Sequence, residues 1–213
     1  ALARVAEARK NPDNIPISGV DALLVTQIAF FDDPVRCAEM TNKLADELEQ
    51  RNKDGVSVFE KGTKRIMLTG TPMAIPNWKL HHIIETSGGV VVCEEMCTGT
   101  RYFERLVDET KETVDEQIAA IADRYMGINC ACFTPNTGRF DDVVRLAKES
   151  KADGVIDVNL MFCTTYDIEG RSLEERCKAE SEENTELCRR TEDHQLGIGE
   201  HGTEIDHRTD TDE

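Results

Sequence analysis

Aromatic residues, basic residues and long hydrophobic runs are all scarce in this sequence. Aromatics make up 5 % of the 213 residues, so a core must be built mainly from aliphatic side chains. Lys and Arg total 25 against 42 Asp and Glu, which gives a net charge of −17. Because nucleic acids and anionic membrane surfaces attract clustered basic side chains, this balance argues against both as partners. Solubility is the simplest reason for such acidity.

No apolar run approaches the roughly 20 residues that a membrane-spanning helix needs. The first residues, ALARVAEARK, contain neither an initiator Met nor the apolar centre of a secretory signal. Their composition predicts a helix cut in its middle, so the chain is expected to be a fragment, and the expected compartment is the cytoplasm. Disulfides are rare there, and closely spaced cysteines then indicate metal or redox ligands.

Helical and extended patterns alternate along the chain. Helices are predicted near residues 1–10, 19–31, 34–52, 78–87, 114–126 and 140–150, and buried strands at 65–70, 90–92 and 154–158. Asp33 followed by Pro34 is typical of a helix start. Strands that alternate with helices over residues 64–170 predict an α/β fold with a doubly wound parallel sheet and flanking helices. In such sheets ligands bind at the carboxyl ends of the strands.

The chain divides into three parts by composition. Residues 1–60 are predicted to be a helical region that packs on the following domain, and residues 61–179 the α/β domain itself. Residues 171–213 hold 14 acidic residues against 6 Lys and Arg, and the stretch 180–213 has no aromatic and almost no aliphatic residue. It cannot bury enough surface to offset its ordering entropy. We therefore predict that residues 180–213 form a disordered acidic tail.

Five of the eight cysteines lie together in predicted loops of the α/β domain. Cys37 suits an apolar helix face, where a cysteine acts as a small hydrophobic residue, and Cys177 and Cys188 lie in the charged end of the chain. The remaining five form a C-x-x-x-C pair, a C-x-C pair and a single cysteine: Cys93, Cys97, Cys130, Cys132 and Cys163. The first and last of these follow predicted strands directly. Such a set predicts an oxygen-sensitive metal or cluster site.

Zinc and iron–sulfur clusters are the two candidates for this site. Zinc takes four nitrogen or sulfur ligands, and such sites usually staple small domains that lack a core. The α/β domain has a core, and His81 and His82 lie inside a predicted helix, so zinc is the weaker alternative. Soft thiolates also select iron–sulfur clusters. A 4Fe-4S cubane held by three thiolates leaves one iron open to a further ligand.

Three segments carry a resemblance to a known family: DNIPISGVDALLV, GGVVVCEEMCTGTRYF and INCACFTPNTGRFDDVVRLAKESKADGVIDVNLMFCTTYDIEG. Over about residues 10–180 the sequence resembles the 2-hydroxyacyl-CoA dehydratase and benzoyl-CoA reductase family, which includes the 2-hydroxyglutaryl-CoA dehydratase D-component. It corresponds to the C-terminal half of a subunit. The resemblance implies flavodoxin-like domains with a cluster between them, and a separate ATP-hydrolysing iron–sulfur activator that supplies low-potential electrons. It also implies that Cys163 is a cluster ligand.

Additional cysteines set this sequence apart from the simple dehydratase pattern. With Cys93 and the Cys130–Cys132 pair as further ligands, it is similar to the branch that carries an 8Fe-9S double-cubane cluster, whose members are ATP-dependent reductases of small molecules. The expected function is therefore the iron–sulfur catalytic component of a two-component reductase. The alternatives are a 2-hydroxyacyl-CoA dehydratase subunit and a zinc-binding module without redox chemistry. Expected partners are the activator, a second family subunit in a homo- or heterodimer, and an acyl-CoA or other small-molecule substrate.

The resemblance ends before the tail. The family normally continues after the helix near Leu173 with a strand, an acidic loop and a C-terminal helix. None of these is predicted from Glu180 onward. The edge of the sheet and the last helix are therefore expected to be missing.

Other polar residues near the cysteines are weaker candidates. Glu94 and Glu95 flank the cluster cysteines and could move protons, although a solvated or capping carboxylate is the commoner role. Arg101 and Tyr166 could orient a substrate. The stretch TGTPMAIPN after the first strand lacks the Gly-x-x-x-x-Gly-Lys spacing of a phosphate loop. ATP is therefore expected to be hydrolysed by the partner.

Overall fold

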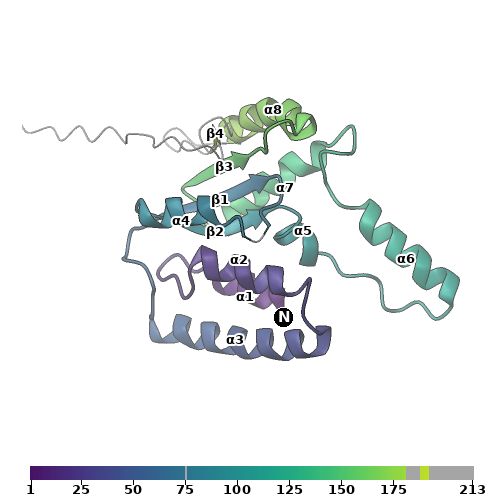
Figure 1. The fold of residues 1–213 in the computed structure, drawn as a ribbon, viewed down its shortest axis with the longest axis horizontal. Coiled ribbons are helices and arrows are strands. Elements are labelled where there is room, and N and C mark those ends of the chain that lie inside the picture. Colours follow the sequence, from purple (N-terminus) through teal and green to yellow (C-terminus); the bar gives the residue numbers. More distant parts are fainter. Residues whose placement is uncertain (75, 181–187, 192–213) are drawn as a thin grey trace, which may run out of the picture.

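A parallel sheet in the order β2-β1-β3-β4 forms the centre of the protein (Figure 1). The computed structural model describes residues 1–74, 76–180 and 188–191. Each neighbouring pair of strands is parallel. The strands are β1 (Lys64–Gly70), β2 (Gly89–Glu95), β3 (Gly154–Val158) and β4 (Cys188–Thr191). The predicted α/β fold is confirmed.

Helices cover both faces of the sheet, as a doubly wound fold requires. Because side chains alternate along a strand, neighbouring residues of β1 enter different cores. Leu68 packs in a core with side chains of α2 and α4, whereas Met67 packs in a core with side chains of α7 and α8. These helices are α2 (Gly19–Ile28), α4 (Lys79–Thr86), α7 (Thr137–Glu149) and α8 (Thr164–Glu180).

Helix α1 (Leu2–Ala8) lies beside α2, and α3 (Pro34–Asp54) adds a further layer outside them (Figure 1). The start of α3 is set by Asp33, whose side chain accepts hydrogen bonds from the first backbone amides, and by Pro34 in the first turn. Its end is set by Gly55, which adopts a left-handed conformation with φ +69°. The start at Asp33 and Pro34 was predicted from the sequence and is confirmed.

The carboxyl end of β1 is closed by a close approach to β3. Gly70 has φ +115°, and a Cβ atom there would lie 2.2 Å from the carbonyl oxygen of Val158. The backbone amide of Thr71 donates a hydrogen bond to that same oxygen at 2.8 Å. Glycine is therefore required at this position, and the chain turns away from the sheet at the edge where ligands bind in such folds.

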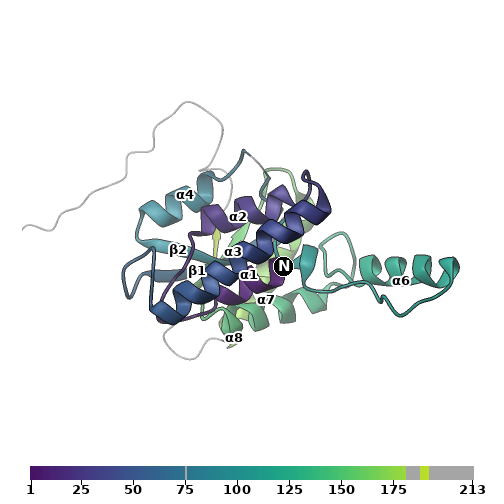
Figure 2. The same ribbon diagram turned by 90° about the horizontal axis from the view of Figure 1, so that it is seen from below.

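Helix α6 (Val114–Met126) projects from the rest of the protein (Figures 1 and 2). Thr113 and Glu116 form a reciprocal capping box at its start. Its apolar stripe stays exposed over Val114, Ile118, Ile121 and Tyr125. None of the described helices is long and apolar enough to cross a membrane.

Two short elements were not predicted: α5 (Thr100–Phe103) and β4. Strand β4 corrects the expectation that no strand follows α8, because its four residues pair with β3 in parallel. That pairing uses backbone groups, so the apolar content that guided the prediction did not reveal it. The rest of the predicted tail, residues 181–187 and 192–213, lies outside the described residues.

Candidate active site

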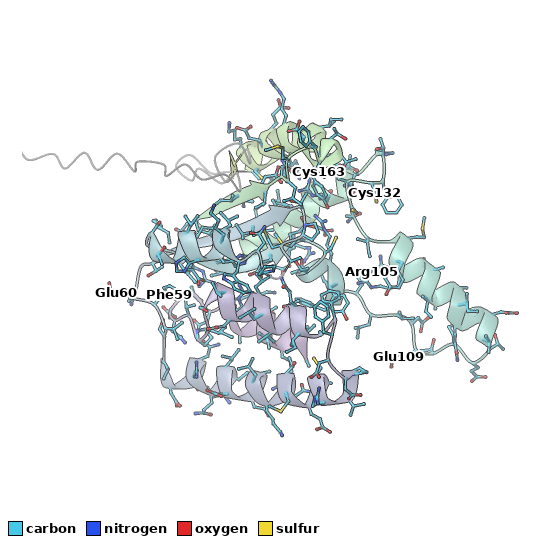
Figure 3. All side chains as sticks on the ribbon, viewed as in Figure 1. Phe59, Glu60, Arg105, Glu109, Cys132 and Cys163 are labelled. Atoms are coloured by element: carbon cyan, nitrogen blue, oxygen red, sulfur yellow. The ribbon has the colours of Figure 1, made fainter. Side chains whose placement is uncertain are left out.

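Four of the five predicted cysteine ligands lie in loops at one end of the sheet. Cys97 follows β2, Cys163 follows β3, and Cys130 and Cys132 occupy the loop before α7. All four are free thiols, and each is exposed or partly exposed. Cys132 and Cys163 both appear at the side of the sheet from which α6 projects (Figure 3). We call these four residues the cysteine edge.

Cys93 lies apart from the cysteine edge. It was expected to follow the strand, but this is wrong, because β2 continues past it. The pairing of β1 with β2 shifts by one residue at Val92, between the pairs Ile66–Val91 and Met67–Cys93. This bulge places Cys93 in the core shared with α7. Burial there raises the pKa of the Cys93 thiol to about 12, so it stays neutral. Its role as a ligand remains a prediction.

The turn after β2 carries Cys97 to the surface and places α5 on the end of the strand. A Cβ atom on Gly99 would lie 2.1 Å from the carbonyl oxygen of Glu94, so the turn requires glycine. The hydroxyl of Thr100 donates a hydrogen bond to the same oxygen at 3.3 Å. The buried hydroxyl of Thr98 has no hydrogen-bond partner among the described residues. This packing fixes the first turn of α5 beside Cys97.

The two thiols of the Cys130–Cys132 loop have different electrostatic surroundings. Burial raises the pKa of Cys130, but hydrogen bonds from the Cys132 amide and the Tyr166 hydroxyl outweigh it and lower that pKa below its usual value. The pKa of Cys132 is raised by burial, then by a hydrogen bond with Cys130 and by the charge of Cys130, with a smaller contribution from Cys97. Cys130 and Cys97 therefore both lie near the Cys132 thiol.

Cys163 directly precedes α8, and its carbonyl oxygen accepts the amide of Asp167 at 3.1 Å. The preceding residue, Phe162, has φ +67° and is 91 % exposed. A bulky residue in the left-handed region is uncommon, and such backbone strain is often held at functional sites. The loop therefore holds Phe162 outward beside the thiol.

A buried guanidinium connects the cysteine edge to the interior. Arg101 of α5 donates from Nε to Glu95 and from Nη2 to the same carboxylate at 2.8 Å. Its Nη1 donates to the hydroxyl oxygen of Tyr166 and lies 4.0 Å from Sγ of Cys97. The Tyr166 hydroxyl lies 3.6 Å from Sγ of Cys130. One arginine therefore contacts one cysteine directly and a second through a tyrosine.

A second guanidinium, that of Arg139, lies fully buried beneath this group. It donates to Thr69 Oγ1 at 3.1 Å, to Asp157 Oδ1 at 3.2 Å and to Glu169 Oε2 at 3.1 Å. Its carbon Cζ lies 4.8 Å from the ring centroid of Tyr166. The charges of the carboxylates offset the cost of burying this cation.

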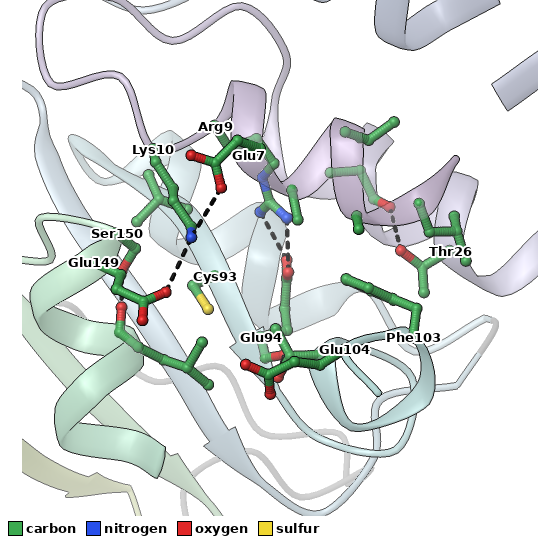
Figure 4. A pocket seen from close by; sticks show the side chains of 18 residues that line it. Glu7, Arg9, Lys10, Thr26, Cys93, Glu94, Phe103, Glu104, Glu149 and Ser150 are labelled. Carbon is green, nitrogen blue, oxygen red and sulfur yellow. Dashed lines mark hydrogen bonds and ion pairs between the residues drawn. The ribbon is translucent and has the colours of Figure 1, made fainter. Parts of the chain in front are cut away.

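Glu94 belongs to a separate buried group on the other side of β2 (Figure 4). Both of its oxygens accept hydrogen bonds from Arg9, at 2.8 and 2.9 Å, and His81 Nε2 lies 3.3 Å away. Burial would raise the pKa of Glu94, but Arg9 and His81 lower it to about 2. Arg9, Glu94 and Cys93 line a cavity of about 150 Å³. A carboxylate held in this way is a weak proton acceptor, so proton transfer by Glu94 remains a prediction without support from its contacts.

The same ion pair predicts acid sensitivity. A folded-state pKa of about 2 lies below the usual 4.5, so the stabilisation by Glu94 is complete above about pH 5 and is lost as the pH falls toward 2. The shift corresponds to roughly 3 kcal/mol. Urea unfolding should therefore show Glu94→Gln well below wild type at pH 6, with the gap narrowing toward pH 3. Glu116→Gln at the exposed start of α6 is the control, and a Glu94→Gln gap that stays constant with pH would contradict this prediction.

Glu95, like Glu94, is buried and bound by neighbouring side chains. Its side chain is 2 % exposed, accepts from Thr69 at 2.5 Å and receives both donors of Arg101. It is neither solvated nor a helix cap, and its proposed part in proton movement stays untested.

Arg9 and Arg139 are the site-supporting residues that sequence reasoning missed. Each lies in line with apolar residues of its helix: Arg9 follows Val5 by four positions, and Arg139 precedes Val143 by four. An arginine within the apolar stripe of a helix is the sequence feature that could have identified both residues. The helix of Arg139 was predicted to begin at Phe140, three residues after its observed start at Thr137, which hid this signal.

The cysteine edge has the donor chemistry of a soft-metal group. Its thiols lie beside the cation of Arg101, which can offset negative charge on sulfur. Asn159 Oδ1, in the loop that leads to Cys163, and Thr98 Oγ1 beside Cys97 are buried without hydrogen-bond partners among the described residues. Among all the described residues, no three His, Cys, Asp or Glu side chains are arranged to hold a single metal ion. The thiols suit a larger sulfur-bound group, such as an iron–sulfur cluster.

Comparison with known proteins gives two matches. A family model described as 2-hydroxyglutaryl-CoA dehydratase, D-component, matches residues 1–182. The chain is also 33 % identical over 158 residues to the putative dehydratase subunit YjiM of Escherichia coli strain K12. That match covers 74 % of this chain and 40 % of YjiM, so the chain spans about two fifths of the length of this relative.

Proposed function

Because the chain belongs to the family of 2-hydroxyglutaryl-CoA dehydratase D-components, we propose that it supplies one side of the iron–sulfur site of a dehydratase-type enzyme component. The cysteine edge provides the ligands. The substrate is a 2-hydroxyacyl-CoA thioester, from which water is removed. Further ligands and the facing wall of the site come from outside the described residues.

The cysteine edge is the observation that carries this proposal. Four free thiols gather where the strands of a doubly wound sheet end, which is where ligands bind in such folds. Cys130 and, to a smaller extent, Cys97 raise the pKa of Cys132. Thiolates are the usual ligands of iron–sulfur clusters, and reduction potentials depend on nearby charge and on hydrogen bonds to sulfur. Bound there, a cluster supplies one-electron chemistry.

The residues of this chain bind and orient the group. We assign three corners of one cluster to Cys97, Cys130 and Cys163, which come from three different loops. Arg101 places positive charge beside two of these loops. The exposed Phe162 and the neighbouring Leu160 and Met161 give the edge an apolar rim. Such a rim limits access of water to a bound thioester.

The proposal includes a partner that provides electrons. The segment between β1 and α4 has no phosphate-binding spacing, so ATP is hydrolysed by a separate iron–sulfur activator. The complete component is a homo- or heterodimer of family subunits. The open position of the cysteine edge at the end of the sheet leaves room for a facing domain or subunit.

An ATP-dependent reductase with an 8Fe-9S double cubane is the second candidate. The number of accessible thiols favours it, because one cubane with an open iron takes three cysteines and the edge offers four. The position of Cys93 in the core argues the other way, since it removes one of the thiols on which a double cubane would draw.

Metal analysis of the 213-residue chain tests the proposal. We expect protein prepared without oxygen to be brown, to absorb near 400 nm and to contain about four irons with matching sulfide, or about eight for the double cubane. Cys130→Ser should lower the iron content by more than half, because it removes a thiolate from the centre of the edge. Cys163→Ser should do the same.

Cys93→Ala is the matched control for these variants, because it removes a buried thiol and should leave the iron content unchanged. Cys177→Ala removes another thiol of the same core. A colourless protein with one zinc per chain would contradict the proposal and favour a zinc-binding module. Iron loss in Cys93→Ala equal to that in Cys130→Ser would return Cys93 to the ligand set.

A further inference from the structure

We propose that Tyr166 and Arg101 are positioning residues that set the reduction potential of the site by hydrogen bonding to the sulfur atoms of Cys130 and Cys97. This inference rests on the proposed function, because it concerns the group that these cysteines would hold. It assigns a task to two side chains that contact thiols and do not themselves bind metal.

The direction of the hydrogen bonds follows from the contacts. A guanidinium only donates, so the Tyr166 oxygen accepts the bond from Nη1 of Arg101. The hydroxyl proton of Tyr166 is then directed to another acceptor. Sγ of Cys130 lies 3.6 Å from this oxygen and is in place to accept it. Nη1 of Arg101 also lies 4.0 Å from Sγ of Cys97.

These donors are held rigidly. Arg101 forms a two-pronged bond with Glu95, and Thr69 donates to the same carboxylate at 2.5 Å. The Tyr166 side chain is held by the guanidinium of Arg139, whose Cζ is 4.8 Å from its ring centroid. Arg101 and Tyr166 are therefore each held by a buried side chain, Glu95 of β2 and Arg139 of α7. Rigid donors need no reorganisation when the charge on sulfur changes.

The electrostatic consequence has a definite sign. Reduction adds negative charge to an iron–sulfur group, and part of that charge lies on the thiolate sulfurs. A hydrogen bond or a cation at these atoms stabilises the reduced form more than the oxidised form. Tyr166 and Arg101 should therefore raise the potential. Without them, the cluster would need a stronger reductant.

Tyr166→Phe is the variant of choice, because it keeps the ring between the two arginines and removes only the hydroxyl. We expect its iron and sulfide content to equal that of the wild type. Titration with dithionite and redox mediators, followed by electron paramagnetic resonance, should place its midpoint potential below that of the wild type. At the wild-type midpoint, the ratio of oxidised to reduced cluster should rise several-fold.

Two further variants complete the test. Tyr125→Phe makes the same chemical change at an exposed site on α6 and should leave the potential unchanged. Arg101→Lys keeps the charge but cannot serve Glu95, Tyr166 and Cys97 together, so its potential should also fall. A Tyr166→Phe protein with full iron content and the wild-type potential would overturn this inference and leave the proposed function intact. A wild-type chain that holds no iron would remove both.

Discussion

Replacing Arg139 by Met is expected to destabilise the protein by about 3 to 5 kcal/mol, because it removes the buried cation that offsets the charge of several buried carboxylates. The side chains of Arg139, Asp157 and Glu95 are 0, 1 and 2 % exposed, and that of Glu169 is 14 % exposed. Water therefore cannot replace the lost guanidinium at most of these groups. Urea unfolding followed by circular dichroism measures the loss. It is a large share of the roughly 5 to 15 kcal/mol that stabilises a typical domain.

Arg145→Met on the same helix is the matched control. Arg145 also pairs with three carboxylates, those of Glu104, Asp142 and Glu149, but its side chain is 40 % exposed. Exposed pairs contribute little, so its loss should stay under about 1 kcal/mol. Adding Asp157→Asn to Arg139→Met should recover part of the stability, since it removes one of the buried negative charges that Arg139 offsets. Equal losses of stability in Arg139→Met and Arg145→Met would contradict the prediction that burial makes the ion pairs of Arg139 more stabilising than those of Arg145.

Replacing Arg9 by Met is the second large expected effect, again about 3 to 5 kcal/mol at pH 7. Arg9 donates to both oxygens of Glu94 and to the carbonyl oxygen of Val91, and so joins α1 to β2. Without it, His81 is the one side-chain partner that buried Glu94 keeps among the residues that the structure describes. The pKa of Glu94 should then rise, because burial would no longer be outweighed. Urea unfolding between pH 5 and 8 measures both effects.

Arg4→Met provides the comparison on the same helix. Arg4 pairs with Asp46 and Glu49 at the surface, where solvent screens the charges, so its replacement should cost much less than that of Arg9. The double variant Arg9→Met with Glu94→Gln should be more stable than the sum of the two single losses indicates. Additive losses would mean that Arg9 acts through α1 packing and not through Glu94.

The predicted elements were right where neighbours in the sequence decide the structure. Asp33, Pro34 and Gly55 set the ends of α3 through local caps, and the apolar runs of β1 and β3 follow from their own side chains. The short elements α5 and β4 were missed. Helix α5 depends on the close fit of Gly99 against the backbone of Glu94, and β4 depends on backbone pairing with β3, which is distant in the sequence.

For the candidate site, the sequence identified the thiols but not their grouping. The predicted set placed Cys93 with the other four, because the residues around it look like the end of a strand. A single extra residue at Val92 turns Cys93 toward the core, and a bulge of this kind has no clear signal in the sequence. The sequence also did not reveal that Arg9 binds Glu94 and that Arg101 binds Glu95.

The sequence by itself therefore determined the family, the α/β fold and the loops that carry the cysteines, because motifs, caps and apolar periodicity are properties of short stretches. Only the tertiary structure decided which thiols are accessible and which charges are paired. Arg9 and Glu94 are 85 residues apart, Thr69 and Arg139 are 70 apart, and Cys130 and Tyr166 are 36 apart. Such pairs form only when the sheet brings distant segments together, and burial then gives them their strength.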